Sequence, residues 1–328
     1  MAKHTRRAPL TDAERDARRQ AERELLTQAV DQLKSSEGWL RWLKVRKAFH
    51  GYSMNNQLLI ALQKPDATRV AGFQAWLKLG RCVRKGEKAI KIFAPVPPSK
   101  AKLDAWRAAG SLPRDRPRTF FKLTSVFDLS QVDALPEPAV VVELDAPYDL
   151  DVAGDDLAWL LRTDGPLDGL ARELELTLKL TARTGERGAH GWYQHKTRTI
   201  CVYTDATANS QAATAVHEFA HALMRLDRQD GDPELTYARE ELVVESVAYS
   251  VLAVLGVDAG TSSIPYLASW SQQAPIDTIE QHAKLIDRLA RRIETHLTRD
   301  PHATPAAAGP AAAAPSAAPE TAQTRVPT

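Results

Sequence analysis

Residues 215–224, Ala-Val-His-Glu-Phe-Ala-His-Ala-Leu-Met, contain a His-Glu-x-x-His motif within an Ala-rich, helix-favouring run. The run predicts a helix that begins near Asn209-Ser210, two residues that cap helices well. The four-residue spacing places His217 and His221 on one helical face, where two imidazoles can bind one metal and Glu218 can reach a bound water. The alternative is a solvated helix that carries these residues without a metal.

A third ligand is expected nearby, because a catalytic zinc takes three protein ligands and leaves one position open. After Asp232-Pro233, a helix is predicted over Glu234–Leu255, and its residues are apolar nearly all round. Glu241 and Glu245 lie one turn apart in this helix, and buried carboxylates are costly unless they are paired or bound to metal. Glu240 is the rival ligand, and a solvated acidic turn is the alternative.

The spacing from His221 to Glu241 resembles that of the gluzincin family of zinc metallopeptidases. The resemblance implies that His217, His221 and Glu241 bind one Zn²⁺, or another divalent metal, per chain. It also implies that Glu218 is the catalytic general base toward a zinc-bound water. Glu245 corresponds to the acid that orients a ligand histidine, a position where the family usually has Asp.

Residues 191–203, before the motif, predict edge-type β structure, which could hold an extended peptide as an added strand. Four side chains are candidates for stabilising the oxyanion of peptide hydrolysis: Tyr193, Tyr237, Tyr249 and His195. Core packing is the alternative role for each tyrosine.

Charge is distributed unevenly along the chain. Residues 1–130 hold 27 Lys/Arg and 12 Asp/Glu, whereas residues 131–328 hold 16 and 29. The first part is therefore expected to meet a polyanion. An acidic protein or a membrane surface would explain the same imbalance, so charge alone does not identify nucleic acid.

Hydrophobic periodicity and turn residues predict a small α+β unit in the first part. The expected elements are, in chain order, two helices over residues 12–48 with a break near Ser35-Ser36, a helix over Ser53–Gln63, a helix over Gly72–Leu79, a β-hairpin over residues 82–93, a loop over residues 96–117 and a strand over Phe120–Asp128.

Aromatic and basic side chains are interleaved in this part, and base stacking combined with phosphate contacts is what single-stranded DNA binding requires. The candidate DNA-binding residues are Trp42, Lys44, Arg46, Lys47, Tyr52, Asn55, Asn56, Trp76, Arg81, Arg84, Lys85 and Lys88. Several aromatic side chains must nevertheless form the core of so small a unit, and basic residues often lie on a solvated face.

Short motifs in both parts carry a second resemblance. They are Tyr52-Ser-Met-Asn-Asn-Gln57, Gly72-Phe-Gln-Ala-Trp76, Lys85-Gly86-Glu87, Gly191-Trp-Tyr193, the metal motif with Glu240-Glu241, and Tyr266–Trp270. Over roughly residues 20–275 the chain resembles the ArdC-like antirestriction proteins. The resemblance implies an N-terminal domain that binds single-stranded DNA, in a protein of plasmids, phages or integrated elements that protects incoming DNA from restriction.

The predicted fold class is α+β, with a small basic α+β DNA-binding domain followed by a mainly helical, zincin-like metallopeptidase domain with a short β-sheet. The expected boundaries are a first domain over residues 1–135, a linker over 136–149, a second domain over 150–298 and a disordered Ala/Pro-rich tail over 299–328.

Cys82 and Cys201 are too few for a disulfide framework and indicate a reducing compartment. The charged N-terminal segment argues against a signal peptide. The sequence contains no uncharged apolar run of 18 residues, so we expect no membrane span. We therefore expect a cytoplasmic protein without a membrane partner.

Two functions of different classes fit these patterns. The first is a single-stranded-DNA-binding zinc metallopeptidase whose substrate is an unidentified protein, such as a host restriction or regulatory protein. The second is a non-catalytic protein that coats single-stranded DNA and keeps a vestigial or structural metal site. The intact Glu218 favours the first, because a structural zinc needs no general base. A transcription factor released by self-cleavage has less support, since no helix-turn-helix signature is evident.

Overall fold

The structure is a computed structural model that describes residues 11–110, 112, 115–136, 156–183, 188–257 and 275–297. The predicted linker beyond residue 136, the predicted tail over 299–328 and the Tyr266–Trp270 motif lie outside the described residues. The boundaries of the two expected domains therefore stay predictions.

Three helices begin the described chain: α1 (Asp12–Asp31), α2 (Ser36–Phe49) and α3 (Met54–Gln63). The first two are separated by a 3-10 turn over Gln32–Lys34, after which the Ser35 hydroxyl caps α2 by accepting a hydrogen bond from the Gly38 amide. The predicted helices over residues 12–48 and Ser53–Gln63 are thus confirmed. A short helix, α4 (Phe73–Lys78), confirms the one expected over Gly72–Leu79.

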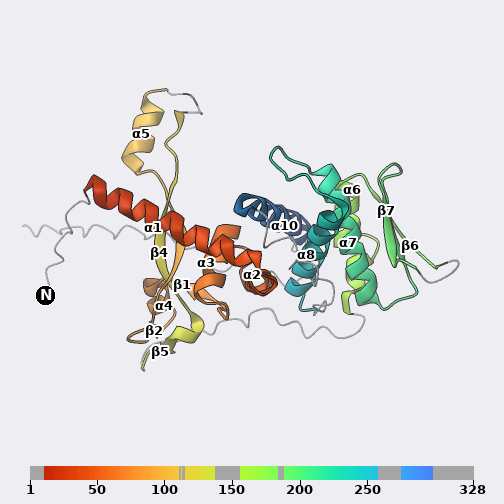
Figure 1. The fold of residues 1–328 in the computed structure, drawn as a ribbon, viewed down its shortest axis with the longest axis horizontal. Helices are drawn as coiled ribbons and strands as arrows, with labels where there is room; N and C mark the ends of the chain where they lie inside the picture. Colours follow the sequence, from red (N-terminus) through yellow and green to blue (C-terminus); the bar gives the residue numbers. More distant parts are fainter. Residues whose placement is uncertain are drawn as a thin grey trace, which may run out of the picture.

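The first part contains an antiparallel sheet in the order β1-β4-β3, with β1 at Val70–Ala71, β3 at Ile90–Val96 and β4 at Phe120–Asp128. Ile90 lies opposite Val126 and Val96 lies opposite Phe120. The predicted strand over Phe120–Asp128 is confirmed over its whole length. In Figure 1, β4 runs behind α1 and continues toward α5 (Lys100–Ala108), away from the second part of the chain.

The predicted hairpin over residues 82–93 is wrong. Gly86, with a φ of 92°, lies in a turn, but β2 (Arg81–Val83) pairs with β5 (Val132–Ala134), whereas β3 pairs with β4. The seven residues of β3 all find partners on β4, and the three residues of β2 could not have offered as many.

The predicted loop over residues 96–117 is also wrong in part, because it contains α5. The Ser99 hydroxyl caps this helix by accepting a hydrogen bond from the Lys102 amide.

The second part begins with a 3-10 segment over Asp156–Leu161 and helix α6 (Pro166–Glu173). A sheet in the order β6-β8-β7 follows, in which β6 is parallel and β7 antiparallel to the central β8. Its strands span Thr177–Thr181 (β6), Gly191–Gln194 (β7) and Thr199–Tyr203 (β8), and the later helices span Ala208–Leu226 (α7), Tyr237–Val254 (α8) and Ile276–Leu297 (α10). Among the described helices, none has both the length and the apolar character needed to cross a membrane.

The start of α8 differs from the prediction. The helix begins at Tyr237 after the N-cap residue Thr236, and the predicted cap Asp232 forms an ion pair with Arg288 instead, at 2.6 Å. The expected apolar character of the helix is confirmed, since most of its side chains are buried.

One hydrophobic core joins the first and second parts of the chain. Trp39 and Trp42 of α2 are buried in the same cluster as Val243 of α8 and Ile286 of α10. The Trp39 indole also donates a hydrogen bond to the Ser246 hydroxyl of α8, at 3.4 Å. Figure 1 shows α2 at the side of the first part that faces α8 and α10. The mixture of helices and strands confirms the predicted α+β class.

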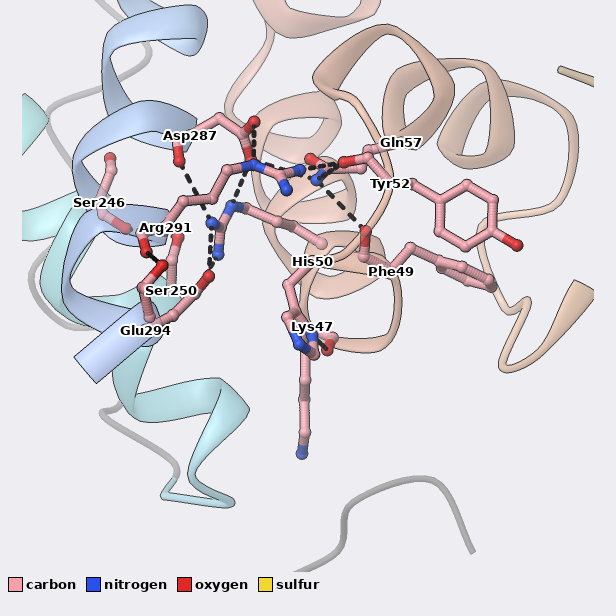
Figure 2. Close-up of polar contacts among 12 residues, drawn as sticks. Lys47, Phe49, His50, Tyr52, Gln57, Ser246, Ser250, Asp287, Arg291 and Glu294 are labelled. Atoms are coloured by element: carbon pink, nitrogen blue, oxygen red, sulfur yellow. Dashed lines mark hydrogen bonds and ion pairs between the residues drawn. The ribbon is translucent and has the colours of Figure 1, made fainter. Parts of the chain in front are cut away.

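A buried polar network crosses the same boundary (Figure 2). Arg46 of α2 is fully buried; its Nε donates to Asp287 at 3.0 Å, and its Nη1 and Nη2 donate to Glu294 at 2.7 and 3.2 Å. Gln57 donates to the Tyr52 carbonyl and to Asp287. Burial alone would lower the pKa of Arg46, but Glu294 and Asp287 outweigh burial and raise it. The network thus keeps charged groups of α2 and α10 paired inside the protein.

Candidate metal centre

Helices α7 and α8 bring the three predicted metal ligands together. One ligand atom each of His217, His221 and Glu241 lies within 4.8 Å of the other two. The Nε2 atoms of His217 and His221 lie 3.8 and 3.6 Å from the Glu241 carboxylate oxygens, and the two imidazole rings are 5.0 Å apart between centroids. Two imidazoles and one carboxylate around a common point form a donor set that suits Zn²⁺ and related divalent cations.

Two further carboxylates of α8 lie behind the histidine rings. Glu245 Oε1 is 3.4 Å from His217 Nδ1, and Glu240 Oε1 is 3.3 Å from His221 Nδ1. Such contacts fix the tautomer that leaves Nε2 free to bind a metal. Both Nε2 atoms indeed face Glu241. The geometry therefore favours Glu241 as the ligand and places Glu240, the rival, behind the His221 ring.

Glu218 lies beside the ligands and is buried, with 8% of its surface exposed. Burial, reinforced by the negative charge of Glu241, raises its pKa to about 7, although a hydrogen bond from the Tyr193 backbone acts in the opposite sense. A carboxylate with a pKa close to neutrality can accept a proton in one step and return it in the next.

His217 is predominantly neutral at neutral pH. Burial lowers its pKa to about 4, and the neighbouring His221 acts in the same direction. The carboxylates of Glu241 and Glu245 oppose this shift by proximity. Because a metal binds the neutral imidazole, protons compete little with a metal for His217.

Strand β7 lies against α7 through a glycine. A Cβ at Gly191 would come within 2.7 Å of the Cys201 carbonyl and 2.6 Å of the Thr214 side chain, and within 3.6 Å of Glu218. Only a residue without a side chain therefore lets β7 approach Glu218 this closely. The Gly191-Trp-Tyr193 pattern was noted in the sequence, but the contact that requires the glycine is not visible there.

The oxyanion candidates occupy different places. The Tyr193 hydroxyl lies 3.2 Å from His195 Nδ1, on β7 and the turn after it. Tyr237 is 77% exposed and the Glu241 carboxylate raises the pKa of its hydroxyl, whereas Tyr249 packs against the core. Core packing therefore describes Tyr193 and Tyr249 but not Tyr237.

The structure contradicts direct DNA contacts by two predicted tryptophans. Trp42 and Trp76 have no exposed surface, and their indole nitrogens donate to Gln57 Oε1 at 3.1 Å and to the Phe127 carbonyl at 2.9 Å. The prediction that they stack on bases is wrong, because both rings belong to the core.

Arg46 and Asn56 are also internal. Arg46 is held by two carboxylates of α10, and Asn56 exchanges two hydrogen bonds with the backbone of Phe93, at 2.8 and 2.9 Å. Asn56 therefore fixes β3 to α3, and neither side chain is available to DNA. The predicted DNA contacts of these two residues are wrong for the same reason.

The other candidate DNA-binding residues keep some or all of their surface. Lys44, Lys85 and Lys88 are exposed, and Arg84 is exposed although it forms ion pairs with Glu87 and Asp133. The remaining four are partly buried: Lys47, Tyr52, Asn55 and Arg81. The DNA contacts of these eight residues stay predictions.

Comparison with known proteins bears on the first part directly. Residues 20–127 match the family described as the N-terminal domain of anti-restriction factor ArdC. The metal-free crystal structure of the antirestriction protein ArdC from plasmid R388 matches with a TM-score of 0.50 and 19% identity, over 83% of this chain and 97% of that one. The first part of the chain is thus similar to the N-terminal domain of ArdC.

Two further matches cover smaller shares of both chains. The Mn(II)-bound crystal structure of the R388 protein matches with a TM-score of 0.46 and 21% identity, over 74% of this chain and 83% of that one. An uncharacterized Bacillus anthracis protein is 27% identical over 289 residues, or 81% of this chain. The chain spans about half of that relative, 48% of its length.

Proposed function

We propose that the chain is an ArdC-like, cytoplasmic antirestriction protein of a mobile element that binds single-stranded DNA and hydrolyses a protein substrate in a zincin-like second domain. The observation that carries the proposal is the meeting of His217, His221 and Glu241 beside the buried Glu218. The similarity to the N-terminal domain of ArdC supports the antirestriction role. The substrate would be a host restriction or regulatory protein.

The chemistry assigns separate tasks to the residues of the site. Zn²⁺ or another divalent cation would act here as a Lewis acid toward a peptide carbonyl and a water molecule. His217, His221 and Glu241 hold the cation, while Glu240 and Glu245 orient the histidines. Glu218 takes a proton from the attacking water and delivers it to the leaving amine. Strand β7, an edge of its sheet, offers backbone groups to an extended substrate.

Replacement of Glu218 by Gln tests the peptidase role. Glu218→Gln keeps the three metal ligands and the charged surface of the first part but removes the proton acceptor. Proteolysis, and protection of unmodified plasmid DNA entering a restricting recipient, should fall by about 10²–10⁴ if protection requires peptide hydrolysis. The matched control is Glu234→Gln, because the pair of Glu234 with Arg228 is exposed.

The same variant identifies the substrate class and separates the two candidate functions. An inactive protein with an intact metal site should retain its substrate, so pull-down with Glu218→Gln should enrich a host protein that the wild type cleaves. Undiminished protection by Glu218→Gln, with its metal content intact, would instead establish the non-catalytic, DNA-coating function.

A further inference from the structure

Apolar side chains are exposed together on the projecting end of the β3–β4 pair. We define the arm as residues 91–122, which include most of β3, helix α5 and the first residues of β4. Of the seven exposed large apolar side chains in the described chain, three lie in this segment: Leu112, Phe120 and Phe121, at 51%, 67% and 65% exposure. Figure 1 shows the arm extending past α1, away from α7 and α8. Exposed side chains of this size keep a large apolar area in water, so the arm is a candidate binding surface.

The arm is also strongly basic. Residues 91–122 hold eight Lys/Arg and two Asp/Glu. Lys100, Lys102 and Lys122 are exposed, as are Arg116 and Arg118. Among the described residues of the arm, the one ion pair within the arm joins Arg107 to Asp104, and both partners are at least half exposed. Most of the positive charge is therefore not neutralised by a carboxylate of the arm.

The register of β4 places the two rings on opposite faces. Phe120 and Phe121 are consecutive residues of a strand, so their side chains point to opposite sides of the two-stranded arm. At Phe120 and Phe121, β4 pairs with β3. Its pairing with β1 is confined to the other end of the strand, at Phe127 and Asp128. In the described chain, no strand pairs with the second edge of β4 beside the two rings.

The face of Phe121 continues into a groove beside α1. Phe121 lies opposite Pro95, and two residues along, Leu123 lies opposite Phe93, so Phe93 and Phe121 share a face. Phe93 lines the groove together with Arg19, Glu22, Arg23 and Leu26 of α1. An aromatic ring and two arginines therefore continue from the arm toward α1, beside one glutamate.

We propose that the arm is the surface on which the chain holds single-stranded nucleic acid, with Phe120 and Phe121 as stacking platforms and the arm's lysines and arginines on the phosphates. Rings that stack on bases, beside cations that follow the backbone, are the combination that single strands require. A duplex keeps its base faces covered, so it cannot use the rings. This inference rests on the proposed single-strand binding. It places the binding surface on the arm and not at Trp42 and Trp76, which the sequence indicated.

Binding of a fluorescent dT20 oligonucleotide to the full chain tests the proposal by anisotropy. Phe120→Ser/Phe121→Ser should weaken binding at least about tenfold, because each stacked base contributes a substantial part of the affinity. Phe73→Ser is the matched control: Phe73 is 43% exposed on α4, outside the arm, and its replacement should leave the affinity within about twofold. Both variants should fold, because the replaced side chains are exposed, and circular dichroism checks this.

Photocrosslinking locates the contact independently. An oligonucleotide carrying 5-iodouracil should crosslink to a peptide that contains Phe120 and Phe121. If the double variant bound dT20 as tightly as the wild type, and the crosslinks lay elsewhere, the arm would not be the binding surface. The proposed single-strand binding itself would then still stand. Failure of the wild type to bind dT20 would overturn both. Phe120- and Phe121-dependent binding to phosphatidylglycerol vesicles, with unchanged oligonucleotide affinity, would assign the arm to a membrane surface instead.

Discussion

The Nδ1 atom of His221 lies 3.3 Å from Glu240, on the side of the ring opposite Nε2, which faces Glu241 at 3.6 Å. Two adjacent glutamates of α8 thus serve one histidine in different ways. We expect Glu240→Gln to weaken Zn²⁺ affinity about 10- to 100-fold while retaining one site per chain, because a neutral amide orients and polarises the ring less well. Glu245→Gln should act similarly through His217. Isothermal titration calorimetry measures both; an unchanged affinity in both variants would contradict the orienting role.

The ligand set itself is tested by metal content. The purified chain should hold about one equivalent of Zn²⁺ or a related divalent ion, and His217→Ala and Glu241→Ala should each lose it, since two protein ligands bind such ions weakly. Inductively coupled plasma mass spectrometry after dialysis gives the stoichiometry. If Glu241→Ala kept full occupancy while Glu240→Ala did not, the assignment of the two glutamates would be reversed.

Glu218 should destabilise the metal-free protein. Its folded pKa of about 7 exceeds the ordinary 4.5, so the cost of its buried charge is fully present above pH 7 and is lost progressively as the pH falls from about 7 to 4.5. In EDTA at pH 8, Glu218→Gln should therefore raise Tm by about 2–5 °C, and the gain should shrink toward pH 5. Differential scanning calorimetry at both pH values tests this, with Glu234→Gln as the exposed control. A gain that is equal at both pH values would exclude the charge as its cause.

Arg46 should be among the most sensitive charged residues of α2. Arg46→Met would leave Glu294 buried without its cation and Asp287 with fewer donors, at a cost of about 3–5 kcal/mol in the free energy of unfolding. Arg41→Met on the same helix should cost less than about 1 kcal/mol, because Arg41 pairs with Glu37 at the surface. Urea denaturation gives both values. Arg46→Met/Glu294→Gln should recover part of the loss; no recovery would show that the pairing contributes little.

Local patterns in the sequence were sufficient for most helices and for the metal ligands. His217, His221 and Glu218 belong to one helical repeat, and the apolar surroundings of Glu241 indicated a buried helix with a carboxylate in it. Both signals are contained within a few turns of chain. The strand over Phe120–Asp128 was predicted for the same reason.

What could not be predicted depends on partners far along the chain. The turn at Gly86 suggested a hairpin, but β3 found its partner in β4 across the arm. Arg46 lies among basic and aromatic residues, which is why the sequence predicted that it binds DNA. Its burial depends on Asp287 and Glu294, which follow 241 and 248 residues later in the chain. Trp42 and Trp76 were ambiguous between core and surface, since an aromatic residue suits either.

The pairing of α2 with α10 also sets an order in time during synthesis. Arg46 leaves the ribosome 241 residues before Asp287, which corresponds to roughly 12–48 s at about 5–20 residues per second. During that interval Arg46 cannot form its ion pairs with Asp287 and Glu294. Trp39 and Trp42 likewise lack the α8 and α10 side chains that cover them in the folded protein. The side chains of α2 that pack on α8 and α10 therefore remain uncovered until the last described helix has emerged.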